Sequence, residues 1–255
     1  SSQVLREAMA DARKRNSKRA ARKLTQIDES GQVRFIEQPP AMSSIDDETA
    51  ARVGGFIEQY LTSASVDIRF LMRGYRLRDV ARRAVGVGSV GTRCYLALFE
   101  DGDGHKLILQ AKEAGRSVLD EHGGIAQPVE LIEEINSRGN GARVVGLQRI
   151  LQSASDPFLG HVVKESGQDP VMRDFYVRQF HDMKGSIEAE SLSDGPFIRY
   201  AAACGAVLAR AHSQSDTLGE VVGYAGKGKK VTKAIMEWCA AYADLSHADY
   251  LAFVG

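Results

Sequence analysis

The sequence has 255 residues, 44% of them hydrophobic and 26% charged, which is the composition of an ordinary globular protein. Its 33 Lys and Arg residues balance 33 Asp and Glu, so the chain as a whole has no excess charge to attract nucleic acid or an anionic membrane. It has no apolar run of the roughly 20 residues that span a bilayer, and no Cys-x-x-Cys pair that suggests structural zinc. We therefore expect a cytoplasmic protein with reduced cysteines, no membrane partner and no metal held by this chain alone.

Residues 1–77 are predicted to form a helical segment that includes one short strand. Residues 1–24 carry a weak apolar stripe and many basic side chains, which favours a helix with a solvated basic face. Contact of that face with nucleic acid or anionic lipid is the less favoured alternative. Residues 32–37 are the strand candidate. Ser44, with the acidic residues after it, predicts the start of a helix that ends near Thr62.

Residues 78–184 change to a pattern of strands separated by glycine-rich turns. The region 117–154 reads as helical, with interruptions at the glycines of 123–124 and 139–141. The strand-like runs are 80–85, 94–99, 107–112, 158–164 and 174–180. We therefore predict a five-stranded antiparallel sheet accompanied by one or two helices.

Residues 185–255 show only helical periodicity, with Ile235, Trp238 and Tyr242 on one face of the last helix. The predicted fold class is α+β, in three parts. An N-terminal helical segment (1–77) precedes a sheet lobe (78–184), and a helical lobe (185–255) follows.

The pattern Gly86-x-Gly88-x-x-Gly91 is typical of a loop that cradles phosphates, but short glycine patterns are weak signals alone. A dinucleotide-binding loop opens a helix, whereas the residues after Gly91 are strand-like. A Walker loop ends Gly-Lys-Ser/Thr, and this loop ends Gly91-Thr92 without the lysine. A nucleophile elbow around Ser89 fails because Val87 stands at its first glycine position.

In protein kinases a glycine-rich loop between two strands covers the phosphates, and a turn then leads to a third strand. That arrangement requires a lysine on the third strand, and Lys112 ends the predicted strand 107–112. A solvated lysine at a strand end is the alternative. An acidic partner would come from Glu130, Glu133 or Glu134, which otherwise form an exposed helix face.

Several longer runs carry a family resemblance across nearly the whole chain. They are the segments 79–93, 110–114, 152–160, 176–185, 208–213 and 242–244. The chain resembles the bacterial family called domain of unknown function 2252, which is thought to share the protein-kinase-like fold, near the aminoglycoside phosphotransferases.

The resemblance implies a nucleotide site with ATP and magnesium as the expected cofactors. Gly86, Gly88, Ser89 and Gly91 would form the phosphate-covering loop, and Lys112 would pair with the nucleotide phosphates. Gln179, Phe180 and Asp182 would lie at the link between the lobes, where an adenine could hydrogen-bond to the backbone.

The chain also departs from the family pattern. Members carry a Gly-Asp-x-His-x-x-Asn segment and an Asp-Phe-Asp segment, which resemble a catalytic loop and a metal-binding aspartate, and neither is found here. Because the chain also begins Ser1-Ser2, we expect a C-terminal portion of a longer protein, inactive by itself. The catalytic residues therefore stay unassigned.

The predicted function is a kinase-like, nucleotide-binding phosphotransferase with an unidentified small-molecule or protein acceptor. The alternative is a non-catalytic module that binds nucleotide or a partner chain. We do not expect nucleic acid as a partner. Apolar surface exposed by a missing segment leaves homo-oligomerisation open.

Overall fold

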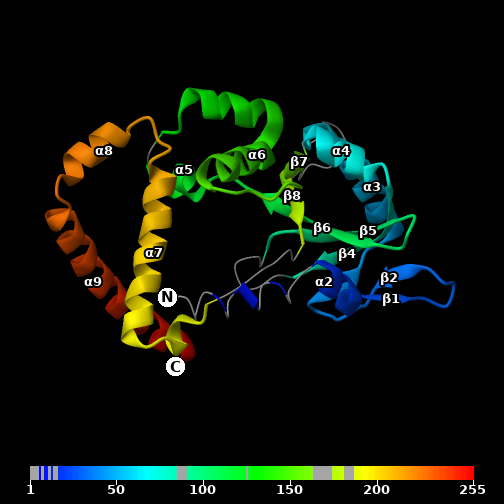
Figure 1. Ribbon diagram of the computed structural model, residues 1–255, viewed down its shortest axis with the longest axis horizontal. Coiled ribbons are helices and arrows are strands. Elements are labelled where there is room, and N and C mark those ends of the chain that lie inside the picture. The colour runs from blue at the N-terminus through cyan, green and yellow to red at the C-terminus, as the bar shows by residue number, and fades with distance from the viewer. Residues whose placement is uncertain are drawn as a thin grey trace. The chain divides into compact units, whose positions relative to one another are not determined.

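The computed structural model describes residues 6, 9–10, 13, 17–84, 91–124, 126–162, 174–180 and 187–255. Within these residues the chain combines helices with one six-stranded and one two-stranded sheet, both antiparallel (Figure 1). This mixed architecture confirms the predicted α+β class.

The predicted elements are found in the predicted order. The strands are β1 Thr25–Ile27, β2 Val33–Phe35, β3 Met42–Ser44, β4 Tyr75–Arg83, β5 Cys94–Asp101, β6 Lys106–Ala114, β7 Gly160–Val162 and β8 Asp174–Gln179. The helices are α2 Ser17–Leu24, α3 Asp47–Ser63, α4 Val66–Met72, α5 Val118–His122, α6 Val129–Leu151, α7 Asp194–His212, α8 Leu218–Ala225 and α9 Lys229–Val254, with a 3-10 turn, η2, at Ala189–Ser191. Of these, β1, β3 and α4 are present in addition to the predicted elements.

The larger sheet has the order β3-β4-β5-β6-β8-β7, so the predicted count of five strands is wrong by one. The extra strand is β3, which pairs with the last residues of β4. Three residues are too few to show a period of two, so nothing in the sequence marks this strand. Ser44 belongs to β3, and the helix start predicted there lies two residues later, where the Asp46 side chain accepts a hydrogen bond from the Thr49 amide at 2.7 Å.

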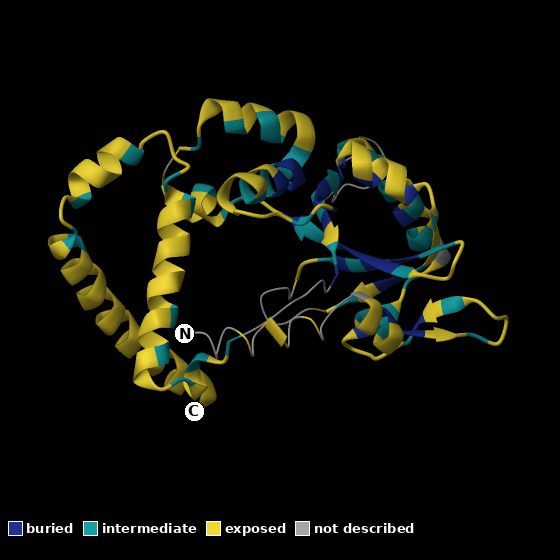
Figure 2. Cartoon of the chain, viewed as in Figure 1, coloured by how far each residue is buried: buried dark blue, intermediate teal, exposed yellow. Residues whose placement is uncertain are grey.

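Two hydrophobic clusters lie on opposite faces of the six-stranded sheet (Figure 2). On the face covered by α3 and α4, Tyr60 and Ile68 meet Phe99, Leu109 and their neighbours. We call it the α3 face. On the other face, Ala21 of α2 meets strand residues including Leu96, Leu98 and Ile108. Because residues alternate between faces along a strand, consecutive residues of β6 join different clusters.

The predicted glycine interruptions are confirmed between and inside the helices. The chain leaves α5 at Gly123, and α6 is kinked at Gly139, whose φ of 77° is a left-handed conformation that glycine adopts at low cost. The turn predicted at 101–104 joins β5 to β6, with the Asp101 carboxylate accepting from the amides of Asp103 and His105. The kink divides α6 into a first part that carries the acidic residues and a second part that packs on the sheet.

The chain divides into two compact units, Ser1–Ala202 and Ala203–Gly255. The second unit holds the end of α7 together with α8 and α9, and the rings of Trp238 and Tyr242 stack with centroids 5.1 Å apart. None of the described helices combines the length and the apolar character that a membrane-spanning segment needs.

Candidate functional site

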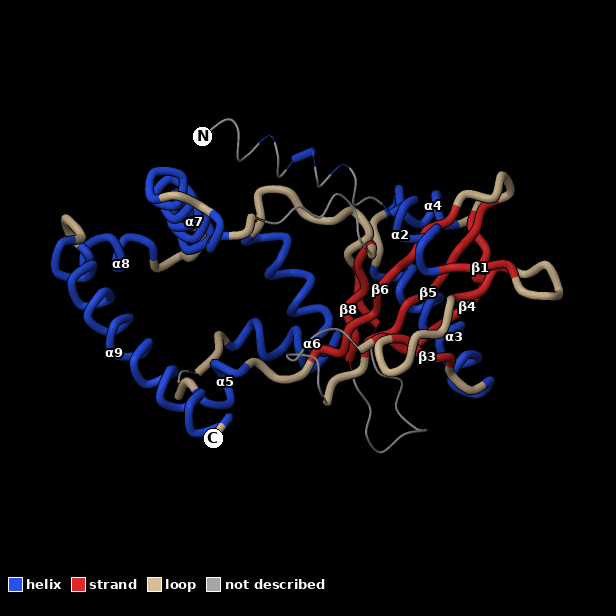
Figure 3. Tube along the Cα trace, turned by 90° about the horizontal axis from the view of Figure 1, so that it is seen from below, coloured by secondary structure: helices blue, strands red, loops and turns tan. Residues whose placement is uncertain are grey.

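A row of four polar side chains crosses the sheet on the face opposite α3. Cys94 of β5 pairs with Lys112 of β6, Lys112 pairs with Tyr176 of β8, and Tyr176 pairs with His161 of β7. Directly paired residues of antiparallel strands point to the same side, so the four side chains share one face. We call this the lysine face. Figure 3 shows β6 and β8 running side by side.

Lys112 is half-buried near the end of β6, beside a buried thiol. The Gln110 amide nitrogen lies 3.3 Å from Cys94 Sγ. Burial raises the pKa of the Cys94 thiol, while Gln110 and the charges of Lys112 and Arg83 act in the opposite direction. The charges of Lys112 and Arg83 therefore both act on the Cys94 thiol on the lysine face.

The connection between β4 and β5 leaves and re-enters the sheet at the Lys112 end, since Arg83 ends one strand and Cys94 begins the other. Its last residues are held against β6. The Arg93 amide donates to Glu113 Oε2 at 2.8 Å, and the Glu113 amide donates to the Arg93 carbonyl at 3.0 Å. Of the predicted loop residues, Gly91 is exposed with a φ of 86°, while Gly86, Gly88 and Ser89 lie outside the described residues.

At the predicted link, which begins at the end of β8, two backbone amides donate hydrogen bonds. The Gln179 amide donates to Asp156 Oδ2 at 2.7 Å, and the Phe180 amide donates to the Ile108 carbonyl at 2.9 Å. Phe180 is buried in the cluster beneath α2. The Arg83 guanidinium lies 5.0 Å from the centre of its ring, within cation–π range, and the buried Nε of Arg83 has no hydrogen-bond partner in the part of the chain that the structure describes. Asp182 lies outside the described residues.

The acidic residues expected near Lys112 lie on the first part of α6. Glu130 and Glu133 are exposed, and Glu134 is half-buried with its carboxylate 3.3 Å from Arg138 Nε. Glu134 also acts electrostatically on His161, at the far end of the row from Cys94. Within the described residues the Lys112 side chain has no ion-pair or hydrogen-bond partner, so the structure does not bring the predicted pair together.

The segment 152–160, part of the family resemblance, has a structural role in the described residues. The Tyr60 hydroxyl donates to the Phe158 carbonyl at 2.9 Å, and Arg149 donates to the Leu159 carbonyl at 2.6 Å. A Cβ on Gly160 would lie 2.7 Å from the Tyr60 ring. Together with the Asp156 bond to Gln179, these contacts join α3, α6, β7 and β8 into one block.

Sequence analysis did not single out Arg83, Cys94, Tyr176 or His161 as members of a site. Each occupies an ordinary strand position. Only the register of pairing brings Cys94, Tyr176 and His161 into one row with Lys112, and Arg83 reaches this face through its ring contact with Phe180. The alternation of residues within β5, β6 and β8 is visible in the sequence, but which positions lie opposite one another is not.

The comparison with known families assigns the chain to a bacterial class of proteins. The family model described as "Uncharacterized protein conserved in bacteria (DUF2252)" matches residues 1–255, so the chain belongs to this family. Neither the curated proteins nor the solved structures contain a significant match.

Proposed function

We propose that the protein binds a nucleoside triphosphate on the lysine face, as a kinase-like phosphotransferase does. The observation that carries this proposal is Lys112 itself. It is half-buried, it stands beside the re-entry point of the glycine-rich connection, and it has no anionic partner among the described residues. A partly desolvated ammonium without a counter-charge favours an anionic ligand, and phosphate oxygens are suitable acceptors for it.

The order of the elements supports the same proposal. In protein kinases a glycine-rich loop covers the phosphates, the lysine lies on the third strand, and a glutamate on the following helix pairs with it. Here the connection joins β4 to β5, Lys112 lies on β6, and α6 follows before β7 and β8. Ile108, which bonds the backbone at the link, is four residues from Lys112, about 13 Å along a strand. That length is comparable with the span from the base to the phosphates of an extended nucleotide.

The kink at Gly139 offers a route for Glu134 to reach Lys112. The second part of α6 is fixed, because the Asn140 amide donates to Asp174 Oδ2 at 2.6 Å and Arg143 donates to the Gly115 carbonyl at 2.9 Å. The first part is joined to it through Gly139, which has a left-handed φ. In our proposal, rotation about this residue brings Glu134 from His161 to Lys112. In the proposal, a bound nucleotide favours this pairing.

Calorimetric titration with ATP, with and without magnesium, tests the proposal. Lys112→Ala is expected to bind at least about tenfold more weakly than the native chain, since a charged hydrogen bond contributes roughly 1.5–3 kcal/mol. Lys106→Ala is the matched control. This lysine lies on the same strand and the same face, but at the opposite end, where its Nζ is 3.5 Å from Thr25 Oγ1.

Equal affinity of all three proteins, or no binding by the native chain, would refute the nucleotide site. Phosphoryl transfer is a separate question. The sequence lacks the Gly-Asp-x-His-x-x-Asn and Asp-Phe-Asp segments that the family resemblance leads us to expect for catalysis. Binding without release of phosphate from ATP would favour the alternative, a nucleotide-binding module without activity of its own.

A further inference from the structure

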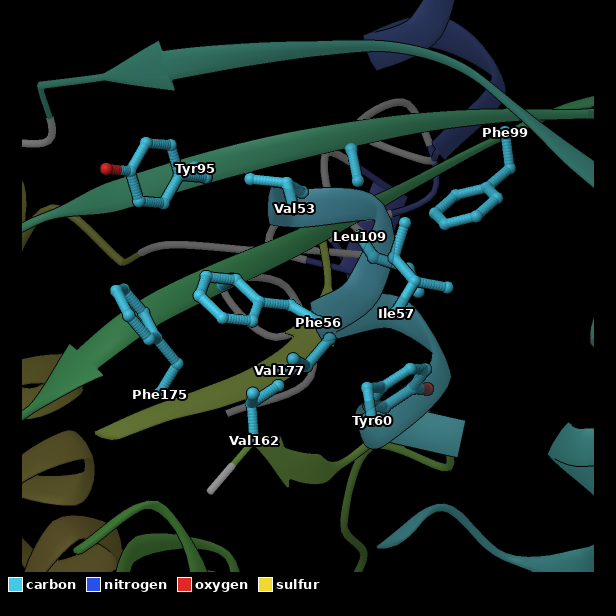
Figure 4. A pocket seen from close by; sticks show the side chains of 12 residues that line it. Val53, Phe56, Ile57, Tyr60, Tyr95, Phe99, Leu109, Val162, Phe175 and Val177 are labelled. Carbon is cyan, nitrogen blue, oxygen red and sulfur yellow. The ribbon is translucent and has the colours of Figure 1, made fainter. Parts of the chain in front are cut away.

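The α3 face contains a hollow between the helix and the sheet (Figure 4). Its volume is about 40 Å³, room for roughly three water molecules. All twelve residues that line it are aliphatic or aromatic, and of their side chains only Tyr60 and Tyr95 carry a polar atom. The Tyr60 hydroxyl already donates to the Phe158 carbonyl, and that of Tyr95 points away from the hollow in Figure 4. Such a space does not suit water, which needs two to four polar partners.

Two alanines create the hollow. Along β5 the residues facing α3 are Tyr95, Ala97 and Phe99, and in the pairing with β6, Ala111 lies opposite Tyr95 while Leu109 lies opposite Ala97. Small side chains therefore lie diagonally across two adjacent strands that otherwise carry large ones. From the helix, Phe56 and Ile57 extend over this gap and remain only half-buried.

Aromatic rings line one side of the hollow. The centroid of the Phe175 ring is 6.0 Å from that of Phe56 and 5.9 Å from that of Tyr95, with interplanar angles of 34° and 51°. A further ring would find tilted partners on this side at the separations that aromatic pairs prefer. Since none of the lining side chains is charged, nothing in the hollow would compensate a charged ligand.

The helix above the hollow is fixed at one end and carries glycines in its middle. Near its C-terminus, the Ser63 hydroxyl donates to the His161 carbonyl at 2.7 Å and accepts from the His161 amide at 2.8 Å. Gly54 and Gly55 precede the residues that cover the gap. Because glycine weakens a helix interior, Gly54 and Gly55 are where we expect α3 to yield when a group larger than the hollow enters it.

We propose that the hollow beneath α3 is a binding site for an uncharged, single-ring aromatic group. It lies on the opposite face of the sheet from Lys112, so the inference does not depend on the proposed nucleotide site. Toluene is a suitable probe, and benzoate, with the same ring and a carboxylate, is its charged counterpart.

The test is an NMR titration of the native chain, Ala97→Leu and Ala202→Leu with each compound. Ala97→Leu fills the hollow, whereas Ala202 is exposed on α7 and provides the same substitution elsewhere. Toluene is expected to bind the native chain and Ala202→Leu alike, and Ala97→Leu at least tenfold more weakly. Benzoate is expected not to bind.

Equal toluene affinity of all three proteins, or no toluene binding by the native chain, would overturn the proposal. If Ala97→Leu fails to show a cooperative unfolding transition, Ala111→Val, a smaller filling substitution, takes its place with the same expected loss. Failure of this test would leave the ATP titration unaffected, because ATP is proposed to bind on the opposite face of the sheet.

Discussion

His161 is half-buried in β7, and its buried Nδ1 has no hydrogen-bond partner among the described residues. Desolvation lowers the pKa of its imidazole, and the charges of Arg138 and Arg149 act in the same direction. Glu134 and Asp174 oppose them without cancelling the effect. The folded chain therefore holds this imidazole neutral at pH values where the unfolded chain begins to protonate it.

The linkage between proton binding and folding gives the direction in which the stability of the fold changes with pH. Below about pH 6.5 the unfolded state binds a proton at His161 that the folded state does not, so stability falls as the pH falls through this value. We expect His161→Gln to lose less unfolding free energy than the native chain between pH 7.5 and pH 5.5. Urea denaturation at the two pH values measures the difference. An unchanged pH dependence would show that His161 does not titrate differently on folding.

At the scale of elements, α6 illustrates how a glycine can be required at one position and dispensable at another. Gly141 is buried where α6 crosses β8, and a Cβ there would collide with the Phe175 carbonyl, a backbone atom that cannot turn aside. Gly146, five residues later in the same helix, is exposed, and no described atom beyond its neighbours and the backbone of its own helix would lie within 4 Å of a Cβ there.

Two substitutions on this helix are therefore expected to have opposite effects. Gly141→Ala should destabilise the fold by about 1–3 kcal/mol, as overpacking does, while Gly146→Ala should stabilise it by about 0.4–1 kcal/mol. Chemical denaturation of both variants beside the native chain measures the changes. A similar effect of the two substitutions would mean that α6 does not approach β8 as closely as the structure indicates.

At the scale of the whole molecule, every buried residue that the structure describes precedes residue 181. The two hydrophobic clusters that hold the six-stranded sheet are therefore complete within the first unit. The helices from Asp194 onward carry many exposed apolar side chains, including Trp238.

Removing residues 194–255 should therefore leave the sheet unit folded. We expect the chain 1–193 to unfold cooperatively, with a urea midpoint close to that of the sheet transition in the full chain. Circular dichroism of both chains across a urea series gives the comparison. Loss of the cooperative transition in 1–193 would show that the C-terminal helices contribute to the stability of the sheet.

The sequence alone predicts most elements because local patterns mark them. The alternation in β5 and β6, the glycines that interrupt 117–154 and the Asp101–Gly104 turn are all local signals, and each appears in the structure near the predicted residues. Lys112 could be singled out for the same reason, as the lysine ending an apolar strand after a glycine loop. The family resemblance, too, is a property of the sequence, and the family match confirms it.

Only the tertiary structure decided which residues face one another. The register between β5, β6, β8 and β7 gathers Cys94, Lys112, Tyr176 and His161 into one row, and the same register places Ala97 and Ala111 under α3 on the opposite side. Strand β3 was missed because its three residues have no recognisable period, and they form a strand only through pairing with β4. Cross-strand pairing joins residues far apart in the chain, and its energy depends on partners that a local pattern does not specify.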